Sequence, residues 1–208
     1  NVGKITNNGV EFSINAIPVQ NRNFTWQTTL NLSHNTNKVN RLSNEKYSTD
    51  SFRQGDPRVA GVSSEGWTQL IMEGQPLGTF YTYEFAGYNE KGVSTYYVHD
   101  AETGERTGET TASPAFKDRT ITGCAQPKLN LGWNNTFSYR NWSASFFFTG
   151  MFGQDVYNGM KAHYTAPDFF AGGKNVLKEF ITKRPATDTG SNIPSDKFIE
   201  DGSFLRLQ

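Results

Sequence analysis

The stretch KLNLGWNNTFSYRNWSASFFFTG, residues 128–150, decides the fold. Apolar residues alternate with polar ones in its first half, and the second half repeats the pattern after the short link Tyr139-Arg140-Asn141. Successive side chains of a β-strand point to opposite faces, so this period of two predicts strands with one apolar and one polar face. Because the link is short, we expect an antiparallel hairpin of residues 128–139 and 141–150. Its alternating apolar residues are Leu129, Leu131, Trp133, Phe137, Trp142, Ala144, Phe146 and Phe148.

A second hairpin is predicted near the start of the chain, over residues 9–18 and 23–34. A turn-rich segment at 20–23 separates its two alternating strands. Further strands are expected at 66–73 and 79–88, the latter rich in aromatic residues. The alternating apolar residues of the second hairpin are Val10, Phe12, Ile14, Ala16, Phe24, Trp26, Leu30 and Leu32.

The connections between the predicted strands are strongly unequal in length. The hairpin turns have a few residues, whereas residues 34–65, 87–127 and 152–200 are long and polar. Compact soluble domains rarely carry such loops, but bacterial outer-membrane barrels combine short periplasmic turns with long extracellular loops. We therefore predict an all-β fold, an antiparallel segment of a large transmembrane β-barrel. Asn130, Asn134, Ser143 and Ser145 are among the polar residues that would face its lumen.

Composition excludes several other classes of protein. The 208 residues are 35% hydrophobic and 19% charged, and no run of about 20 apolar residues suggests a membrane-spanning helix. Twenty basic and twenty acidic residues give no net charge, which argues against a nucleic-acid partner. The single cysteine, Cys124, excludes an internal disulfide framework. An aromatic content of 14% in a polar chain suits a barrel with aromatic girdles.

No pattern predicts an enzyme, a cofactor or a metal site. Phosphate-binding glycine loops, paired-histidine helices and nucleophile elbows are all missing from the sequence. The three histidines, His34, His99 and His163, are far apart, and surface or interface roles are expected for them. Asp100 and Glu102 precede Thr103-Gly104, a pattern that favours a hairpin tip over a catalytic carboxylate pair.

Substrate contacts are the one site prediction. Aromatic rings can stack on sugar faces, so exposed aromatic residues of the loops are the candidates. The alternative is that these rings pack the loops themselves. The candidates are Trp67, Tyr96, Tyr97, Phe169 and Phe170.

Several motifs, in a consistent order, resemble the barrel of SusC/RagA-like TonB-linked outer-membrane proteins. The matching stretches are NGVEF at 8–12, FTW at 24–26, NLSHNTNKV at 31–39, EGQPLGTFY at 73–81, residues 147–158, and IEDGSFLRL at 199–207. Physically, Asn8-Gly9, Gly74 with Gly78, and Asp201-Gly202 are also expected turns. The motifs thus indicate a family without marking a site.

The resemblance implies more than the chain contains. It implies a barrel of about 22 strands, an N-terminal plug that contacts TonB, and a SusD-like surface lipoprotein partner. Residues 1–208 would form a late part of one barrel domain, without the plug and the closing strands. The expected function is import of an oligosaccharide or peptide nutrient across the outer membrane. The sequence starts at Asn1 without Met or signal-peptide features and stops at Gln208 inside an expected strand, so we treat the chain as a fragment.

Two alternatives remain open from the residues alone. A soluble, secreted β-sandwich that binds glycans also has short alternating strands and exposed aromatic rings. Such a sandwich would keep its apolar faces inward, which distinguishes it from a barrel wall. A secreted β-rich enzyme would need a convergent acid or nucleophile cluster, and no such cluster is predicted.

Overall fold

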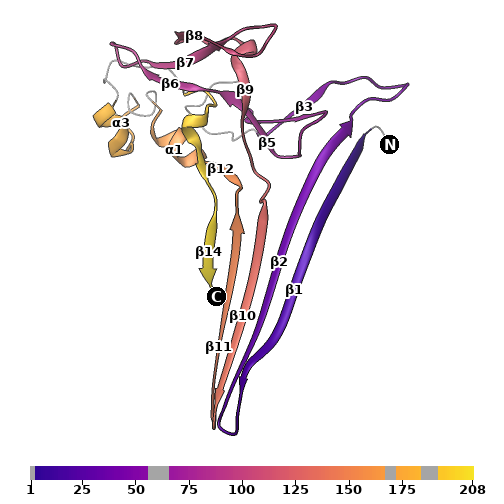
Figure 1. Cartoon of the computed structure of the whole chain (residues 1–208). Helices are drawn as coiled ribbons and strands as arrows, with labels where there is room; N and C mark the ends of the chain where they lie inside the picture. The colour runs from indigo at the N-terminus through magenta and orange to yellow at the C-terminus, as the bar shows by residue number, and fades with distance from the viewer. Residues whose placement is uncertain (1–2, 56–65, 167–171, 184–191) are drawn as a thin grey trace.

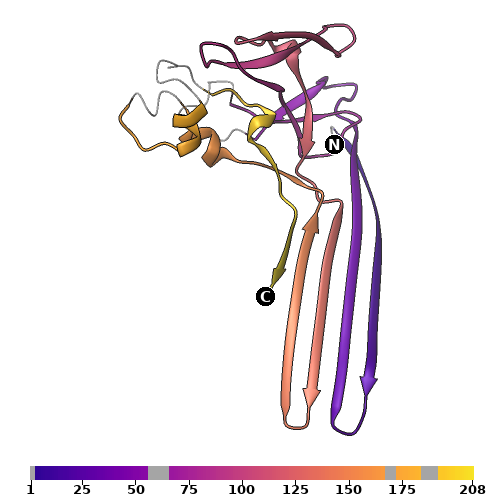
Figure 2. The same ribbon diagram turned by 60° about the vertical axis from the view of Figure 1, so that its left-hand side comes forward.

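The computed structural model describes residues 3–55, 66–166, 172–183 and 192–208 of the chain. One part is a long antiparallel sheet, which we call the wall (Figure 1). The other part, which we call the cap, is a group of short strands and helices at one end of the wall. Both tight hairpin turns of the wall lie at the opposite end (Figure 2). The wall therefore has a capped end and a turn end.

The wall is a five-stranded sheet in the order β1-β2-β10-β11-β14, and every neighbouring pair is antiparallel. Its strands are β1 (Lys4–Gln20), β2 (Phe24–Arg41), β10 (Leu129–Tyr139), β11 (Trp142–Phe152) and β14 (Phe204–Leu207). Both predicted hairpins are thus confirmed, as β1–β2 and β10–β11. They lie side by side because β10 pairs with β2.

The strand register separates an apolar face of the wall from a polar one. Phe12 lies opposite Leu32, which in turn lies opposite Leu131. Directly opposite residues share a face of an antiparallel pair, so these side chains form a row across three strands. On the other face, the Ser13 hydroxyl donates a hydrogen bond of 2.7 Å to Asn31 Oδ1. The next apolar row contains Ile14, Leu30, Trp133 and Phe148.

The first hairpin is taller than the second. Pairing of β1 with β2 continues up to Lys4 and Arg41, whereas pairing of β10 with β2 stops at Ser33. Above that point a cap segment takes the place of β10 at the edge of β2. The Gly74 N–H donates to Val39 O at 2.8 Å, and the Val39 N–H donates to Gln75 O at 3.0 Å. These bonds attach the cap to the wall.

The cap is built from three small sheets and short helices. One sheet has the order β3-β4-β5-β9, another β6-β7-β8, and the third pairs β12 with β13. Their strands are β3 (Ser51–Gln54), β4 (Gln69–Met72), β5 (Thr79–Tyr83), β6 (Phe85–Tyr88), β7 (Ser94–His99), β8 (Arg106–Thr111), β9 (Arg119–Cys124), β12 (Asp155–Tyr157) and β13 (Ile199–Asp201). The helices are α1 (Gly159–Tyr164), α3 (Lys178–Lys183) and the 3₁₀ turns η1 (Phe116–Asp118) and η2 (Asp196–Phe198). Among the described helices, none is long and apolar enough to cross a membrane.

The buried apolar core lies at the capped end. The wall is one layer thick, so its apolar side chains have no second protein layer among the described residues to pack against. Side chains of the cap instead pack against one another. The buried apolar residues are Val39, Leu42, Trp67, Leu70, Phe80, Tyr83, Tyr96, Ala162, Ala166, Phe180 and Phe198.

Two expectations about local structure were wrong. The strand expected at 79–88 is divided at Glu84, because the chain leaves the sheet of β5 there and enters that of β6. Asn8-Gly9 forms no turn, since both residues pair inside β1 with Thr36 and Asn35. The long connections at 34–65 and 87–127 include the upper part of β2 and several cap strands.

Candidate functional site

A hollow of about 630 Å³ lies on the polar face of the wall, directly below the cap. The wall supplies most of its side chains, and the cap closes one side with Leu77, Gln126 and Pro127. Strand alternation explains the lining, because residues two apart along β1 and β2 point to the same face. The wall residues that line the hollow are Ile5, Asn7, Glu11, Asn35, Asn37 and Asn130.

The chemistry of this hollow is dominated by side-chain amides. A side-chain amide carries both a hydrogen-bond donor and an acceptor, so it can bind either the acceptor or the donor groups of an uncharged polar ligand. Asn37 Oδ1 accepts a 2.7 Å hydrogen bond from the Leu77 N–H, which fixes the cap against the wall. Asn130 reaches the Ser33 hydroxyl at 3.4 Å. This lining suits sugar hydroxyls or peptide amides better than a strongly charged ligand, since Glu11 is its one ionisable side chain.

The opposite face of the wall is apolar and uncovered. Val10 is 71% exposed, Phe12 52% and Ile14 43%. Aromatic rings gather toward the turn end, where Trp26 stacks on Phe137 with 5.8 Å between ring centroids. An uncovered apolar face of this extent needs a partner that is itself apolar.

Arg119 organises the centre of the cap. Its side chain is buried, and its Nη1 donates hydrogen bonds of 3.1 Å to the carbonyl oxygens of Trp67 and Tyr81. The guanidinium carbon lies 3.7 Å from the Trp67 ring centroid and 4.7 Å from that of Tyr83. A buried cation is tolerated when hydrogen bonds and aromatic faces replace its water, as they do here.

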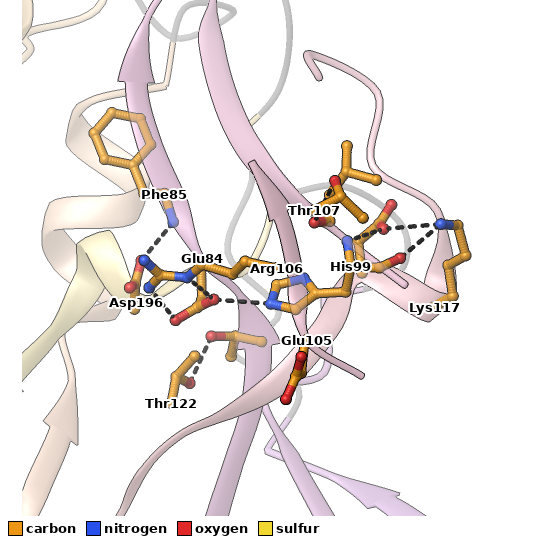
Figure 3. A network of polar contacts seen from close by, with 12 residues as sticks. Glu84, Phe85, His99, Glu105, Arg106, Thr107, Lys117, Thr122 and Asp196 are labelled. Atoms are coloured by element: carbon orange, nitrogen blue, oxygen red, sulfur yellow. Dashed lines mark hydrogen bonds and ion pairs between the residues drawn. The ribbon is translucent and has the colours of Figure 1, made fainter. Parts of the chain in front are cut away.

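A charged cluster ties β6, β7 and β8 together (Figure 3). Glu84 accepts hydrogen bonds from Arg106 Nε at 2.8 Å and Arg106 Nη2 at 2.6 Å. The same carboxylate lies 2.9 Å from His99 Nε2. Two parallel hydrogen bonds between a guanidinium and a carboxylate fix the relative orientation of the two groups. Through these bonds Glu84, which lies between β5 and β6, is held to the outermost strand, β8.

Asp196 of η2 approaches this cluster from a different loop (Figure 3). Its Oδ1 accepts a 2.8 Å hydrogen bond from the Phe85 N–H. Burial raises the pKa of Asp196 above its usual value, and the nearby negative charge of Glu84 adds to this effect. The pKa of Glu84 is lowered instead, chiefly because Arg106 hydrogen-bonds its carboxylate. The pKa values of the two carboxylates are therefore shifted in opposite directions, so Asp196 is protonated at a higher pH than Glu84.

The structure places three of the five predicted substrate contacts. Trp67 and Tyr96 have 7% and 4% of their surface exposed, and both pack against other rings of the cap. Tyr97 is half-buried, and the Arg106 guanidinium lies 4.3 Å from its ring centroid. Phe169 and Phe170 lie outside the described residues. Neither Trp67 nor the two tyrosines line the hollow below the cap, and substrate contact by these residues stays a prediction.

Other site expectations have mixed outcomes. His99 is buried inside the cap, where a surface or interface role was expected, because its ring is held by Glu84. Asp100 forms the predicted hairpin tip, accepting hydrogen bonds from the backbone N–H groups of Glu102 and Thr103. Within the described residues, no group of three potential ligands could hold a metal ion.

Sequence reasoning missed the residues that organise the cap, namely Glu84, Arg119 and Asp196. Each looks like an ordinary charged residue in a polar stretch. One signal was present for Glu84, because it interrupts the aromatic run Phe80, Tyr81, Tyr83 and Phe85. No comparable signal marks the other two.

A one-layer sheet with an uncovered apolar face, a polar hollow on the other face and a cap at one end defines a stretch of transmembrane β-barrel wall. Comparisons with known proteins agree with this class. Over 224 residues the chain is 29% identical to "TonB-dependent receptor P3" of Formosa agariphila, covering 100% of the chain and 21% of that protein. It is 26% identical over 213 residues to "TonB-dependent receptor SusC" of Bacteroides thetaiotaomicron, covering 99% of the chain and 20% of the relative.

The solved structure of the RagAB peptide transporter shows the same fold. It superposes with a TM-score of 0.75 at 21% identity, over 100% of this chain and 22% of the other. No family model matches the sequence. The chain spans about a fifth of the length of the curated relatives it matches. The chain is also 30% identical over 225 residues to "TonB-dependent receptor P26" of Formosa agariphila, covering 100% of the chain and 22% of that protein. The predicted family is confirmed: the chain is a segment of a SusC/RagA-like TonB-dependent receptor.

Proposed function

We propose that the whole protein imports a nutrient across the bacterial outer membrane, and that this chain supplies part of its barrel wall and extracellular cap. The nutrient is an oligosaccharide or a peptide. A SusD-like lipoprotein covers the cap, and TonB supplies the energy. All 208 residues belong to one barrel domain. Transport requires binding and release at the lumenal face, and it involves no covalent catalysis.

The uncovered apolar face is the observation that carries this proposal. Between Val10 and Val19 the outward residues of β1 are mainly apolar and exposed. That stretch is about 30 Å long, and at a tilt of roughly 35° it crosses the 25 Å apolar band of an outer-membrane barrel. Aromatic residues at the turn end, including Trp142 at 81% exposure, then lie at the membrane boundary.

The two faces also fit a transport path through the barrel. With the apolar face toward lipid, the amide-lined hollow faces the lumen beneath the cap. SusC and RagAB are named as a TonB-dependent receptor and a peptide transporter, which supports uptake without fixing the nutrient of this protein. Amides bind hydroxyl and peptide groups alike, so the hollow is compatible with both nutrient classes.

A soluble glycan-binding sandwich is the alternative function. A sandwich buries the apolar faces of two sheets against each other. In the described part of the chain, the wall has one layer, and its apolar residues are exposed. This arrangement favours the barrel.

Spin labelling of the whole receptor tests the membrane-spanning arrangement. We expect nitroxides at Phe12, Ile14 and Leu131 to be relaxed by oxygen, which partitions into lipid. Labels at Ser13 and Asn15, on the opposite face, should be relaxed by a water-soluble nickel chelate instead. Water access at the first three positions would contradict a lipid-facing wall.

Uptake measurements test the transport proposal. Cells that carry the intact receptor should accumulate labelled oligosaccharides or peptides, and a receptor deletion or a protonophore should abolish the uptake. Equal accumulation by the deletion strain for both nutrient classes would rule out the proposed import.

A further inference from the structure

Two cap segments that are far apart in sequence are joined at one strand, β6. One is the three-stranded sheet β6–β8, which we call the arm. The other is the segment Ser195–Phe198, which leads through β13 into the wall strand β14. Just before β6, at the end of β5, Tyr83 forms a parallel bridge with Ser195, and its N–H donates a 3.1 Å hydrogen bond to Pro194 O.

Adjacent residues of opposite charge hold the two ends of β6. Asp196 Oδ1 accepts from the Phe85 N–H at 2.8 Å, at the beginning of the strand. Lys197 Nζ donates to the Tyr88 hydroxyl at 2.7 Å, at its end. The Lys197 ammonium also lies 5.0 Å from the Phe85 ring centroid and 4.9 Å from that of Tyr88. Because the contacts lie at both ends of β6, they oppose rotation of the strand as well as its separation from the Ser195–Phe198 segment.

The arm is internally cross-braced. Glu84, just before β6, is bound by Arg106 at the start of β8 and by His99 at the end of β7. Lys117 Nζ donates a 2.7 Å hydrogen bond to His99 O, and Asp118 Oδ1 accepts one of 2.9 Å from the His99 N–H. A force on β8 is therefore passed to β6 without passing along the chain.

The other side of the contact continues into the wall. Phe198 is 1% exposed and packs edge-on against Tyr157 of β12, with 6.0 Å between centroids. The next strand, β13, pairs with β12, and β14 then pairs with β11. Few residues separate the Asp196–Lys197 contact from the barrel itself.

We propose that Asp196 and Lys197 form a clasp that makes the arm and the segment entering β14 move as one body, so that a load on the arm is transmitted to the wall. This coupling does not depend on a nutrient bound in the barrel lumen. The clasp therefore stands or falls independently of the transport proposal.

Distance measurements between spin labels in the whole detergent-solubilised receptor test the clasp. One label replaces Thr103 at the arm tip and the other replaces Ser143 at the turn end of the wall. With the clasp intact we expect one narrow distance distribution. The double variant D196A/K197A should at least double its width, whereas the E90A/K91A variant, which removes an adjacent acidic and basic pair from the same arm, should leave it unchanged.

Hydrogen exchange supplies a second, local readout. The amide of Phe85 should exchange at least tenfold faster in D196A/K197A, and D196N should preserve its protection because an amide oxygen still accepts the bond. Heat-modifiable migration on gels shows whether each variant barrel is folded. A folded D196A/K197A receptor that keeps the narrow distribution overturns the clasp, and so does equal broadening in E90A/K91A.

Discussion

Asn135 is a polar residue on the apolar face of the wall. It is 4% exposed, and its Oδ1 accepts a 3.1 Å hydrogen bond from Trp26 Nε1. A buried amide without a partner costs free energy, so this bond decides whether Asn135 is tolerated there. The neighbouring strands thus share a polar contact within an apolar surface.

Trp26→Phe should destabilise the barrel through this contact. The substitution keeps an aromatic ring but removes the donor, leaving the Asn135 carbonyl oxygen unpaired. We expect a loss of about 1–3 kcal/mol in the free energy of unfolding, measured with denaturant in detergent or vesicles. Trp142→Phe, at an exposed ring on the same face, is the control and should cost less. Equal losses would show that the hydrogen bond is unimportant.

Glu84 governs the pH dependence of the arm. Its pKa lies below the ordinary value of 4.5, so its ionised form stabilises the folded arm above that value. The stabilisation is lost as the pH falls through the lowered pKa. After correction for intrinsic rates, amide exchange in β8 should accelerate as the pH falls below 4.5. Glu84→Gln should show roughly tenfold faster exchange already at pH 7, while Glu105→Gln should not.

At the scale of elements, alternation along long strands predicted the wall because each face differs clearly in polarity over ten or more residues. The cap gave no such pattern. Its strands have three to six residues, and β8, with the sequence RTGETT, is polar on both sides. Those strands are held by contacts between distant segments, such as Tyr83 with Pro194, which sequence periodicity does not contain.

The same distinction applies to the candidate site. The lumenal polar residues Asn130 and Asn134 were predicted, since strand alternation assigns their face. The hollow itself was not predicted, because its closing side comes from Leu77 and Gln126 of the cap. Its aromatic ring alone also made Trp67 a predicted substrate contact, but the structure buries that ring inside the cap.

The two faces of β1 should respond oppositely to charge. Ile14→Arg places a guanidinium toward lipid and should cost about 2–4 kcal/mol, reducing the fraction of receptor that folds into vesicles. Asn15→Arg, one residue further on the lumenal face, should fold nearly as well as the unmodified receptor. Similar folding of both variants would contradict the assigned faces.

For the whole molecule, the amide-lined hollow should influence uptake. Removing the side-chain amides of Asn35 and Asn130 together should raise the nutrient concentration that gives half-maximal uptake by roughly tenfold, as expected for a few lost hydrogen bonds. Asn8→Ala, on the outward face of β1, is the control and should leave uptake unchanged. Unaltered uptake in the double variant would exclude the hollow as a binding site.

The unequal length of the two hairpins also affects which part of the protein is exposed at the cell surface. Above Ser33, the pair β1–β2 continues to Arg41 without β10, roughly 26 Å further along the strand. The outward residues of that stretch are polar, among them Thr36 and Lys38. On a cell it would project past the lipid headgroups, where antibodies and bacteriophages arrive first. Selection by those attackers would then shape the outward residues of this stretch, whereas its inward residues Asn35 and Asn37 line the hollow.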